Sequence, residues 1–155
     1  TPETEEYGIG SFVYRSKRPF DPNRFWHYIQ HKFPMSIIRS KGLFWLASRP
    51  EQALSWGQAG GSLRADSAGV WWSSMPFEKR IRYVSFLENQ KAIEAEWSEE
   101  FGDRKNEIVF IGQDMDEELI RVELDACLAD NAELSTSRWE NGYEDAWPIE
   151  RAYAL

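Results

Sequence analysis

The period of the hydrophobic positions changes along the chain, and each period predicts a different element. Over residues 8–15, GIGSFVYR, strand-forming residues follow one another in a way that predicts a β-strand. The later Asp21-Pro22 joins an N-cap residue to a proline suited to the first helical turn. A helix is therefore expected from Asp21 to about Phe33.

Two further segments in the first half of the chain have strand character. SIIRSKGLFWLA, residues 36–47, is β-branched and aromatic, and Gly42 within it favours a bend or bulge. We expect either a strand pair or one kinked strand there. Residues 53–66 are expected to form another strand, with Gly60-Gly61 as punctuation, followed by a turn and the apolar stretch 70–72.

Beyond residue 76 the pattern becomes helical and then alternates with one strong strand. Apolar residues at mostly helical spacings over 77–99 predict one or two helices rich in charge. NEIVFIGQ, residues 106–113, is a continuous apolar run typical of a buried central strand. Residues 114–129 predict an amphipathic helix that begins with acids. Its expected inward positions are Leu119, Val122 and Ala126, with Ile120 and Leu124 as further candidates.

The resulting order, β-α-β-β-α-β-α, indicates an α+β fold. A ferredoxin-like split β-α-β sheet, mostly antiparallel and with helices packed on one face, accommodates this order most simply. The last 25 residues, with Trp139 and Trp147, are expected to pack as an extended C-terminal tail. Residues 1–6, TPETEE, have the composition of a linker end, which leaves 7–155 as one domain.

Composition narrows the environment in which such a domain works. The single cysteine, Cys127, excludes an internal disulfide, fits a reducing compartment, and is expected to be an inert core residue. The chain has no apolar run near 18 residues and no N-terminal signal pattern, so we expect a cytoplasmic protein without a membrane partner. The first residue is Thr1 rather than methionine, which suggests a piece of a longer protein.

The charge is distributed unevenly along the chain. Residues 7–50 hold eight bases and one acid, a net charge of +7, whereas residues 51–155 hold ten bases and 22 acids, a net charge of −12. The acidic total makes nucleic-acid binding unlikely as a function, but the basic third could form a patch for an acidic partner. That patch would form if strands 8–15 and 36–47 pair; solvated edge residues are an equally good interpretation. The candidate interface residues are Arg15, Lys17, Arg18, Arg39, Lys41 and Trp45.

No catalytic or nucleotide-binding motif is present. The glycine-rich stretches 8–11 and 57–62 lead into neither a lysine nor a helix, so turns or bulges explain them better than phosphate loops. There is also no CxxC, no HExxH, and no Ser/His/Asp or Cys/His set with sequence support. We therefore expect a non-catalytic chain.

The only two histidines, His27 and His31, raise the possibility of a metal site. On the predicted helix they lie 40° apart, on a stripe that faces away from the core, so two-point metal contact is possible. Arg24 lies one turn earlier, and no acid or cysteine shares that stripe, so a third ligand would have to come from elsewhere. A small metal-binding module is one alternative function.

The aromatic residues raise a second alternative, an aromatic sheet that binds RNA or peptide. Such a platform would stack bases beside Arg39 and Lys41. A core or protein-interface role is favoured, because aromatic residues commonly fill such layers. The residues concerned are Phe44, Trp45, Trp56, Trp71, Trp72 and Trp97.

Five stretches in order resemble the C-terminal domain of the CobW-type GTPases, also called G3E-type or zinc-chaperone GTPases. They are YGIGSFVYRSKRPFDPNRF (7–25), IIRSKGLFWLASRP (37–50), SWGQAGGSLR (55–64), GDRKNEIVFIGQDMD (102–116) and LDACLADNAEL (124–134). The family runs are of the type FVYR-x-RRPF-HPERF, RSKG-x-WLA, QAGG, GDRRQELVFIG and LDACLLT-x-E. Each is modest alone, but five in sequence are specific.

The resemblance implies a regulatory or interaction domain of a larger metal-handling protein. In the family, an N-terminal P-loop GTPase domain carries the GTP and magnesium sites and a Cys-rich metal motif, and this domain is absent from the chain. The implied cofactors of the whole protein are GTP, Mg and Zn or Co, with none in this chain. The implied partners are the GTPase domain and a client metalloprotein, in roles such as cobalamin biosynthesis. One departure is Asp21, which stands where the family commonly has histidine and puts a metal role there in doubt.

Overall fold

The computed structural model describes residues 8–135 and 145–155, and it confirms an α+β fold. Among these residues, no helix is both long and apolar enough to cross a membrane. The expected linker end, 1–6, and Trp139 lie outside the described residues. The strands are β1 (Ile9–Ser16), β2 (Ile37–Phe44), β3 (Gln52–Ala59), β4 (Ser62–Val70), β5 (Asn106–Gln113) and β6 (Arg151–Ala154). The helices are α2 (Pro22–His31), α3 (Phe77–Arg80), α4 (Val84–Ala95), α5 (Glu117–Asp125), α6 (Asn131–Ser135) and the short 3-10 helix η1 (Trp72–Ser74).

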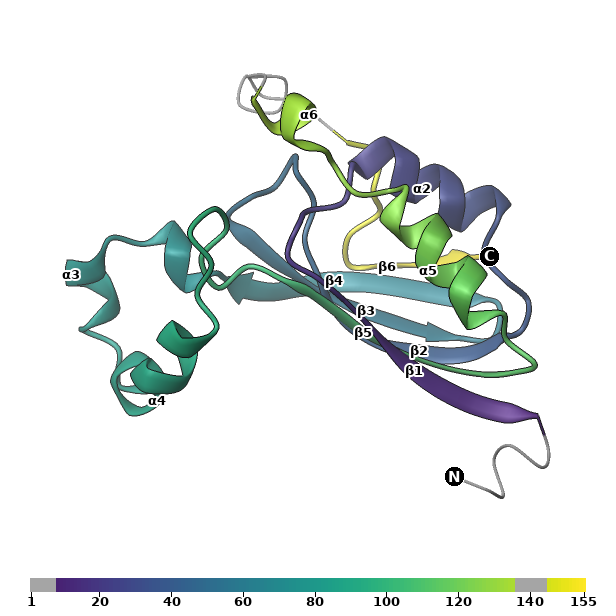
Figure 1. The fold of residues 1–155 in the computed structure, drawn as a ribbon, viewed down its shortest axis with the longest axis horizontal. Coiled ribbons are helices and arrows are strands. Elements are labelled where there is room, and N and C mark those ends of the chain that lie inside the picture. The colour runs from purple at the N-terminus through teal and green to yellow at the C-terminus, as the bar shows by residue number, and fades with distance from the viewer. Residues whose placement is uncertain (1–7, 136–144) are drawn as a thin grey trace.

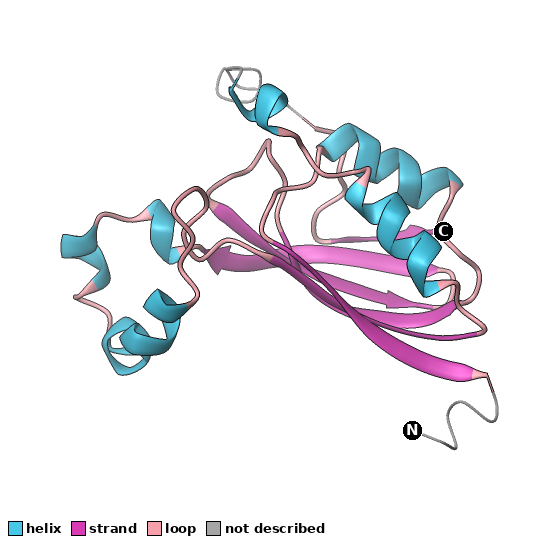
Figure 2. Cartoon of the chain, in the orientation of Figure 1, coloured by secondary structure: helices cyan, strands magenta, loops and turns pink. Residues whose placement is uncertain are grey.

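The six strands form one sheet in the order β1-β5-β2-β3-β4-β6, and every neighbouring pair is antiparallel. Since β5 pairs with both β1 and β2, those two strands run parallel to each other with α2 as their crossover. This is the expected split β-α-β arrangement (Figures 1 and 2). Strands 8–15 and 36–47 do not pair directly, because β5 lies between them, so this condition for a continuous basic patch is not met.

Helices α2 and α5 cover one face of this sheet (Figure 1). The Asp21 carboxylate caps α2 by accepting the backbone N–H of Asn23 and of Arg24 at 2.9 and 3.0 Å. Asp116 caps α5 by accepting the N–H of Leu119 at 3.1 Å. The caps that the sequence predicted therefore fix where each covering helix begins.

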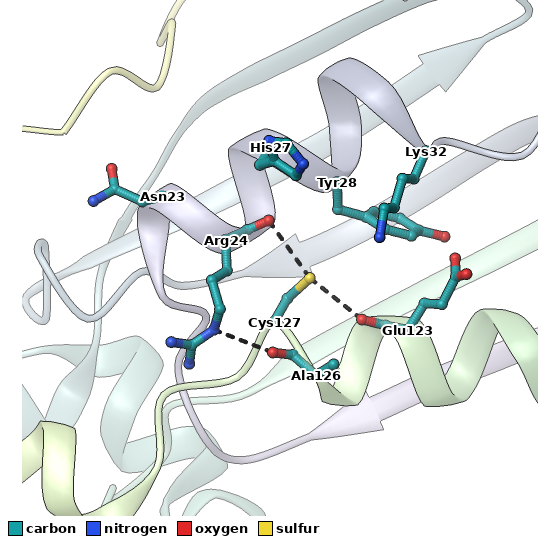
Figure 3. A pocket seen from close by; sticks show the side chains of 8 residues that line it. All are labelled: Asn23, Arg24, His27, Tyr28, Lys32, Glu123, Ala126 and Cys127. Carbon is teal, nitrogen blue, oxygen red and sulfur yellow. Dashed lines mark hydrogen bonds between the residues drawn. The ribbon is translucent and has the colours of Figure 1, made fainter.

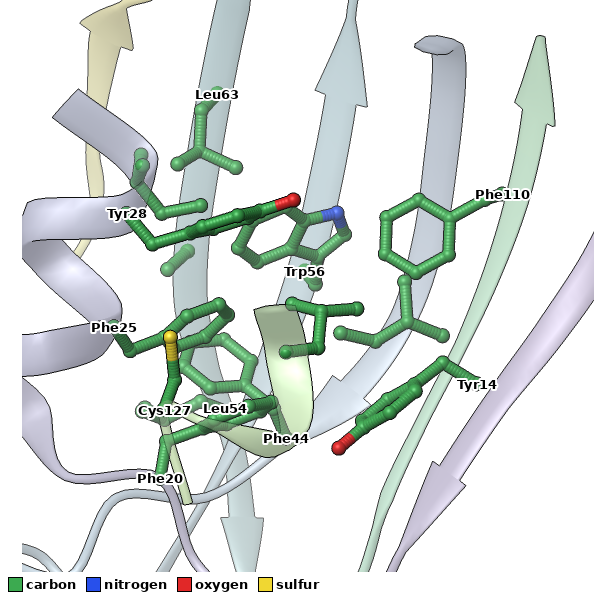
Figure 4. Close-up of a cluster of buried hydrophobic side chains, with 14 of the residues drawn as sticks. Tyr14, Phe20, Phe25, Tyr28, Phe44, Leu54, Trp56, Leu63, Phe110 and Cys127 are labelled. Carbon is green, nitrogen blue, oxygen red and sulfur yellow. The ribbon is translucent and has the colours of Figure 1, made fainter. Parts of the chain in front are cut away.

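Between the helices and the sheet lies an aromatic core centred on Phe25 (Figure 4). Its ring stacks on Phe20 with 3.8 Å between centroids, and it lies 5.6 Å from Trp56 and 5.1 Å from Trp147. All four side chains are at most 4% exposed. Ring–ring contacts of this kind add to the hydrophobic stabilisation of the core.

The C-terminal segment is integrated into the domain more tightly than a loosely packed tail. Arg49 donates to both oxygens of Asp145, at 2.9 and 2.7 Å, and the indole N–H of Trp147 donates to the carbonyl of Pro22 at 2.9 Å. Strand β6 then pairs with β4 and completes the sheet. Residues 145–155 thus supply both a core side chain and an edge strand.

Several local expectations need correction. Residues 52–70 form a hairpin, β3–β4, rather than one strand, because Gly60 adopts a φ of 55° and turns the chain. The β2 irregularity lies between Ile37 and Arg39 rather than at Gly42. Gly42 is needed instead for close approach, since a Cβ there would lie 2.0 Å from the carbonyl oxygen of Glu107.

The inward face of α5 was also placed wrongly. Ile120 and Leu124 are 2% exposed, whereas Leu119 and Val122 are 49% and 59% exposed. The helix starts only at Glu117, and its contact with the sheet selects the stripe of Ile120 and Leu124. Of the two sets of expected inward positions, the second is therefore the one that packs.

Residues 72–103, which hold η1, α3 and α4, form an arm that extends beyond the end of the sheet and away from α2 and α5 (Figure 1). The carboxylate of Asp103 closes its base by accepting the N–H of Trp72 and of Ser73 at 2.8 and 2.9 Å. A small cluster of Trp45, Trp71 and Phe101 joins the arm to the sheet. The two helices predicted within 77–99 are thus present, but they do not cover the sheet.

Candidate functional site

The side of the sheet opposite α2 and α5, here called the open face, is the main uncovered surface of the sheet (Figure 1). Strand register places its side chains in rows. One row reads Val13, Val109, Lys41, Gly57 and Arg64 across five strands. The next row reads Ser11, Ile111, Arg39, Ala59 and Ser62. Apolar residues on β1 and β5 therefore lie beside cations on β2 and small residues on β3.

The cations surround a shallow hollow of about 410 Å³ whose floor includes Gly57 and Ala59. Arg39 and Lys41 are exposed on one rim, and in the described part of the chain no carboxylate lies within ion-pair distance of either. Arg64 on the other rim pairs with Asp66 at 3.0 Å. Two strong positive charges thus remain available for an acidic partner.

A buried polar network underneath holds this part of the sheet in place. Ser40 donates to Oε1 of Gln58 at 2.7 Å and accepts the indole N–H of Trp56 at 2.7 Å. Ser40 and Gln58 are at most 3% exposed, so these bonds form away from water, where they are most effective. The network fixes β2 against β3, and with them the spacing of the cations above.

The remaining candidate interface residues each have contacts of their own. Arg15 pairs with Glu107 at 3.2 Å, and the Lys17 ammonium donates to the carbonyl of Glu96 at 2.6 Å. Arg18 donates to Asn131 at 2.5 Å, beyond the end of β1. Trp45 is 4% exposed and packs in the cluster that supports the arm. Arg15 shares the open face, two residues beyond Val13 on β1, but among the described residues only Arg39 and Lys41 of the predicted set lie on this face without a carboxylate partner.

Sequence reasoning missed Arg64 as a neighbour of this pair. The prediction of a single strand over 53–66 did not define which residue Arg64 lies opposite in the sheet. A hairpin turn at Gly60-Gly61 would have placed Arg64 opposite Gly57, and therefore two strands from Lys41. The glycine pair was the available signal.

The histidine pair lies on α2 as the periodicity predicted. Both side chains are exposed, and their ring centroids are 4.6 Å apart. Within residues 8–135 and 145–155, no group of three or more His, Cys, Asp or Glu side chains is arranged to hold a metal. Zinc sites in proteins take three or four protein ligands. A metal site at His27 and His31 thus stays a prediction, since the two histidines alone are fewer ligands than such a site requires.

A groove of about 470 Å³ between α2 and α5 brings Cys127 near His27 (Figure 3). The Cys127 thiol is 5% exposed and donates to the carbonyl of Glu123 at 3.3 Å. Burial raises the pKa of Cys127 to about 11, so the thiol stays protonated at neutral pH. A protonated, buried thiol is a poor metal ligand and a poor nucleophile, which agrees with the expected core role.

Burial excludes four of the six aromatic residues considered as a platform for RNA or peptide binding, and the other two, Trp72 and Trp97, are half-buried in the arm. Phe44, Trp45, Trp56 and Trp71 are each at most 6% exposed, within or beside the core. The two described rows of the open face hold aliphatic, small and cationic residues instead. Base stacking needs exposed ring faces, which these four residues do not offer.

The chain is an α+β domain whose sheet is covered by helices on one face and carries exposed cations on the other. Residues 9–128 match the family described as the cobalamin synthesis protein cobW C-terminal domain. The chain belongs to this family, as the sequence motifs indicated.

The names of two similar proteins mention zinc. It is 42% identical over 136 residues to zinc-regulated GTPase metalloprotein activator 1 of Dictyostelium discoideum, covering 86% of this chain and 28% of that protein. It is 33% identical over 129 residues to a zinc chaperone of Mycobacterium tuberculosis, covering 83% of this chain and 32% of that protein. The chain thus spans about a third of the length of these relatives.

Solved structures support the fold. The zinc-bound YjiA GTPase from E. coli matches with a TM-score of 0.53 at 17% identity, over 82% of this chain and 32% of that one. A triple mutant of the same GTPase matches with a TM-score of 0.52 at 19% identity, over 79% of this chain and 30% of that one.

Proposed function

We propose that this chain is the non-catalytic regulatory and interaction domain of a CobW-like P-loop GTPase that delivers zinc or cobalt, or assists metalloprotein assembly, in the cytoplasm. The observation that carries the proposal is membership of the CobW C-terminal family in a chain about a third as long as relatives named as GTPases and zinc chaperones. GTP, magnesium and the metal cargo would be handled by the GTPase domain. This domain would influence that chemistry through contact.

The open face is the surface we assign to contact with the GTPase domain. Arg39 and Lys41 lie on neighbouring rows and have no ion-pair partner among residues 8–135 and 145–155, and Val109 and Ile111 beside them are each 39% exposed. An acidic surface with an apolar centre would match this combination. Cations at the rim would guide and orient the contact, and the aliphatic residues would gain from burial.

A charge reversal tests this assignment in the full-length protein, in which the GTPase domain precedes this one. We expect Arg39→Glu/Lys41→Glu to change the rate of GTP hydrolysis by about five-fold or more, the lower end of usual inter-site coupling. The matched control is Lys32→Glu/Arg151→Glu, which alters the net charge equally at exposed positions away from the open face. Equal rates for the wild type and the open-face variant would refute the assignment.

The parentage itself has a simpler test. The reading frame upstream of Thr1 should encode a GxxGxGKT-type phosphate loop and a Cys-x-Cys-Cys motif. A frame that encodes neither would overturn the proposed function as a whole, independently of which surface is used.

A further inference from the structure

Helix α4 of the arm carries apolar side chains on both of its sides. Phe86, on the inner side, is fully buried, whereas Val84 and Leu87 are 67% and 51% exposed. At 100° per residue, Val84 lies 160° and Leu87 100° from Phe86 around the helix axis. A helix that is apolar on both sides is normally covered on both, and here only one side is covered.

The exposed apolar residues continue from α4 into α3 and the turn between them. Phe77, Ile81 and Tyr83 are 48%, 41% and 41% exposed. With Val84 and Leu87 they make five exposed large hydrophobic side chains within eleven residues, here called the arm patch. Scattered surface hydrophobics need no explanation, but a cluster of this density indicates a contact site.

The arm does not need the patch for its own stability. Phe86 packs against Trp72 with 5.2 Å between ring centroids, and the Arg80 guanidinium lies 4.5 Å from the ring centroid of Trp97. Arg80 also donates to the carbonyls of Trp72 and Met75 at 2.8 and 3.0 Å. These contacts lie on the inner side and hold the arm together. Phe77 and Tyr83 also touch this inner cluster at one edge, with ring centroids 6.4 Å from Phe86 and 5.6 Å from Trp72, but Ile81, Val84 and Leu87 remain largely uncovered by the described residues.

We propose that the arm patch is a second docking site for the GTPase domain of the same polypeptide. The inference rests on the proposed function, and it adds an apolar anchor to the cationic open face. Partners that come and go usually meet through surfaces no more apolar than the rest of the protein, whereas permanent neighbours cover markedly apolar ones. The arm patch exposes five large apolar side chains, with the exposed charged residues Glu78, Lys79 and Arg82 between them in sequence. More than two thirds of the matched relatives' length lies outside this domain.

Hydrogen exchange of the segment 77–95 provides the test, because it reports on the arm alone. We expect amides of this segment to exchange about ten-fold or more slowly in the full-length protein than in the 155-residue chain, since docking suppresses local opening. Val84→Glu/Leu87→Glu should abolish the difference. Val122→Glu on α5, a similarly exposed position at 59%, should leave it intact.

A second variant guards against misfolding. Val84→Ser/Leu87→Ser removes the apolar surface without adding charge, and it should also restore fast exchange while the domain keeps its thermal unfolding midpoint. Equal exchange in the full-length protein and the 155-residue chain would overturn the proposal. So would an arm-dependent dimer of the 155-residue chain in analytical ultracentrifugation, since a second copy would then be the occupant.

The two proposals fail separately. Protection of the arm together with no effect of Arg39→Glu/Lys41→Glu on GTP hydrolysis would remove the open-face contact and keep the arm contact. An effect of that charge reversal without arm protection would do the opposite.

Discussion

The sheet with its two covering helices and the arm are both aromatic, yet they use aromatic residues differently. Phe25 and Phe86 are both fully buried. The rings around Phe25, those of Phe20, Trp56 and Trp147, are themselves at most 4% exposed, whereas the rings near Phe86 include Phe77 at 48%. Burial of one residue therefore does not show that its neighbourhood is a core.

The difference teaches where stability and function reside. A layer of mutually buried rings unfolds as one unit, whereas a thin cluster with solvent on its far side can open locally. The first region is built to stay closed. The arm retains exposed apolar surface, which contributes hydrophobic stabilisation only when another surface covers it.

The largest effect is expected from removing the centre of the core. Phe25→Ala should lower the free energy of unfolding by about 3–5 kcal/mol, because it deletes a ring packed against four others. Urea unfolding followed by tryptophan fluorescence measures this. Phe86→Ala is the matched variant, and it should raise exchange in 77–103 while leaving the urea midpoint of the sheet nearly unchanged. Equal shifts of that midpoint would show that the arm and the sheet unfold together.

A backbone clash in the central sheet should come next. Gly42→Ala places a Cβ 2.0 Å from the carbonyl oxygen of Glu107 and 2.7 Å from the Cα of Ile108, so β2 and β5 must separate. We expect a loss of about 1–3 kcal/mol or more in thermal or urea unfolding. Gly10→Ala in β1 is the control, since nothing lies within 4 Å of its added Cβ. A Gly42 variant as stable as the Gly10 variant would contradict the register.

A smaller effect is expected on acidification, from the contact that joins α2 to α6. The Arg24 guanidinium donates to both oxygens of Glu133, at 2.9 and 2.8 Å, and lowers the pKa of Glu133 from 4.5 to about 2. A carboxylate with a lowered folded-state pKa stabilises fully above pH 4.5, and this stabilisation disappears as the pH falls towards 2. Glu133→Gln should therefore destabilise near neutral pH and make the acid side of the stability curve shallower. Parallel curves for the two proteins between these pH values would rule this out.

The smallest effect concerns zinc. With two histidines and no third ligand among the described residues, calorimetric titration of the chain should give no binding at micromolar zinc. The variant His27→Ala should behave identically. Heat that appears at micromolar zinc and vanishes in the variant would establish the metal-binding alternative.

Local signals in the sequence predicted the elements better than the contacts between them. The run NEIVFIGQ identified β5 as a strand inside the sheet, and Asp21-Pro22 identified the start of α2. The run was wrong about burial, since Val109 and Ile111 are each 39% exposed on the open face. Which strand lies between β1 and β2 was not predicted, because β1 and β5 pair across 90 residues or more of sequence and neither strand alone indicates its neighbour. The predicted burial of Leu119 and Val122 was wrong. Helical spacing shows which residues share a face, but not which face packs on the sheet, and that depends on where the helix begins and how it lies on the sheet.

The sequence predicted a basic surface as the candidate site, but it predicted only some of the residues that form it. The basic first third pointed to Arg39 and Lys41, whose side chains remain unpaired by carboxylates within the described residues. Lys17 donates to the carbonyl of Glu96 and Arg18 to the side-chain oxygen of Asn131, residues far away in the chain, and charge counting does not reveal such contacts. The arm patch escaped notice because helical spacing reads the same for a buried and an uncovered helix.

The docking of Trp147 and β6 has a practical consequence for anyone who shortens this protein. The family match ends at residue 128, and a gene trimmed there would appear to retain the whole domain. It would instead leave the Phe25 ring without one of its neighbours, Pro22 without the indole that binds its carbonyl, and the outer edge of β4 unpaired. An unpaired edge beside an opened aromatic core favours aggregation. Soluble expression would therefore require residues that family boundaries omit.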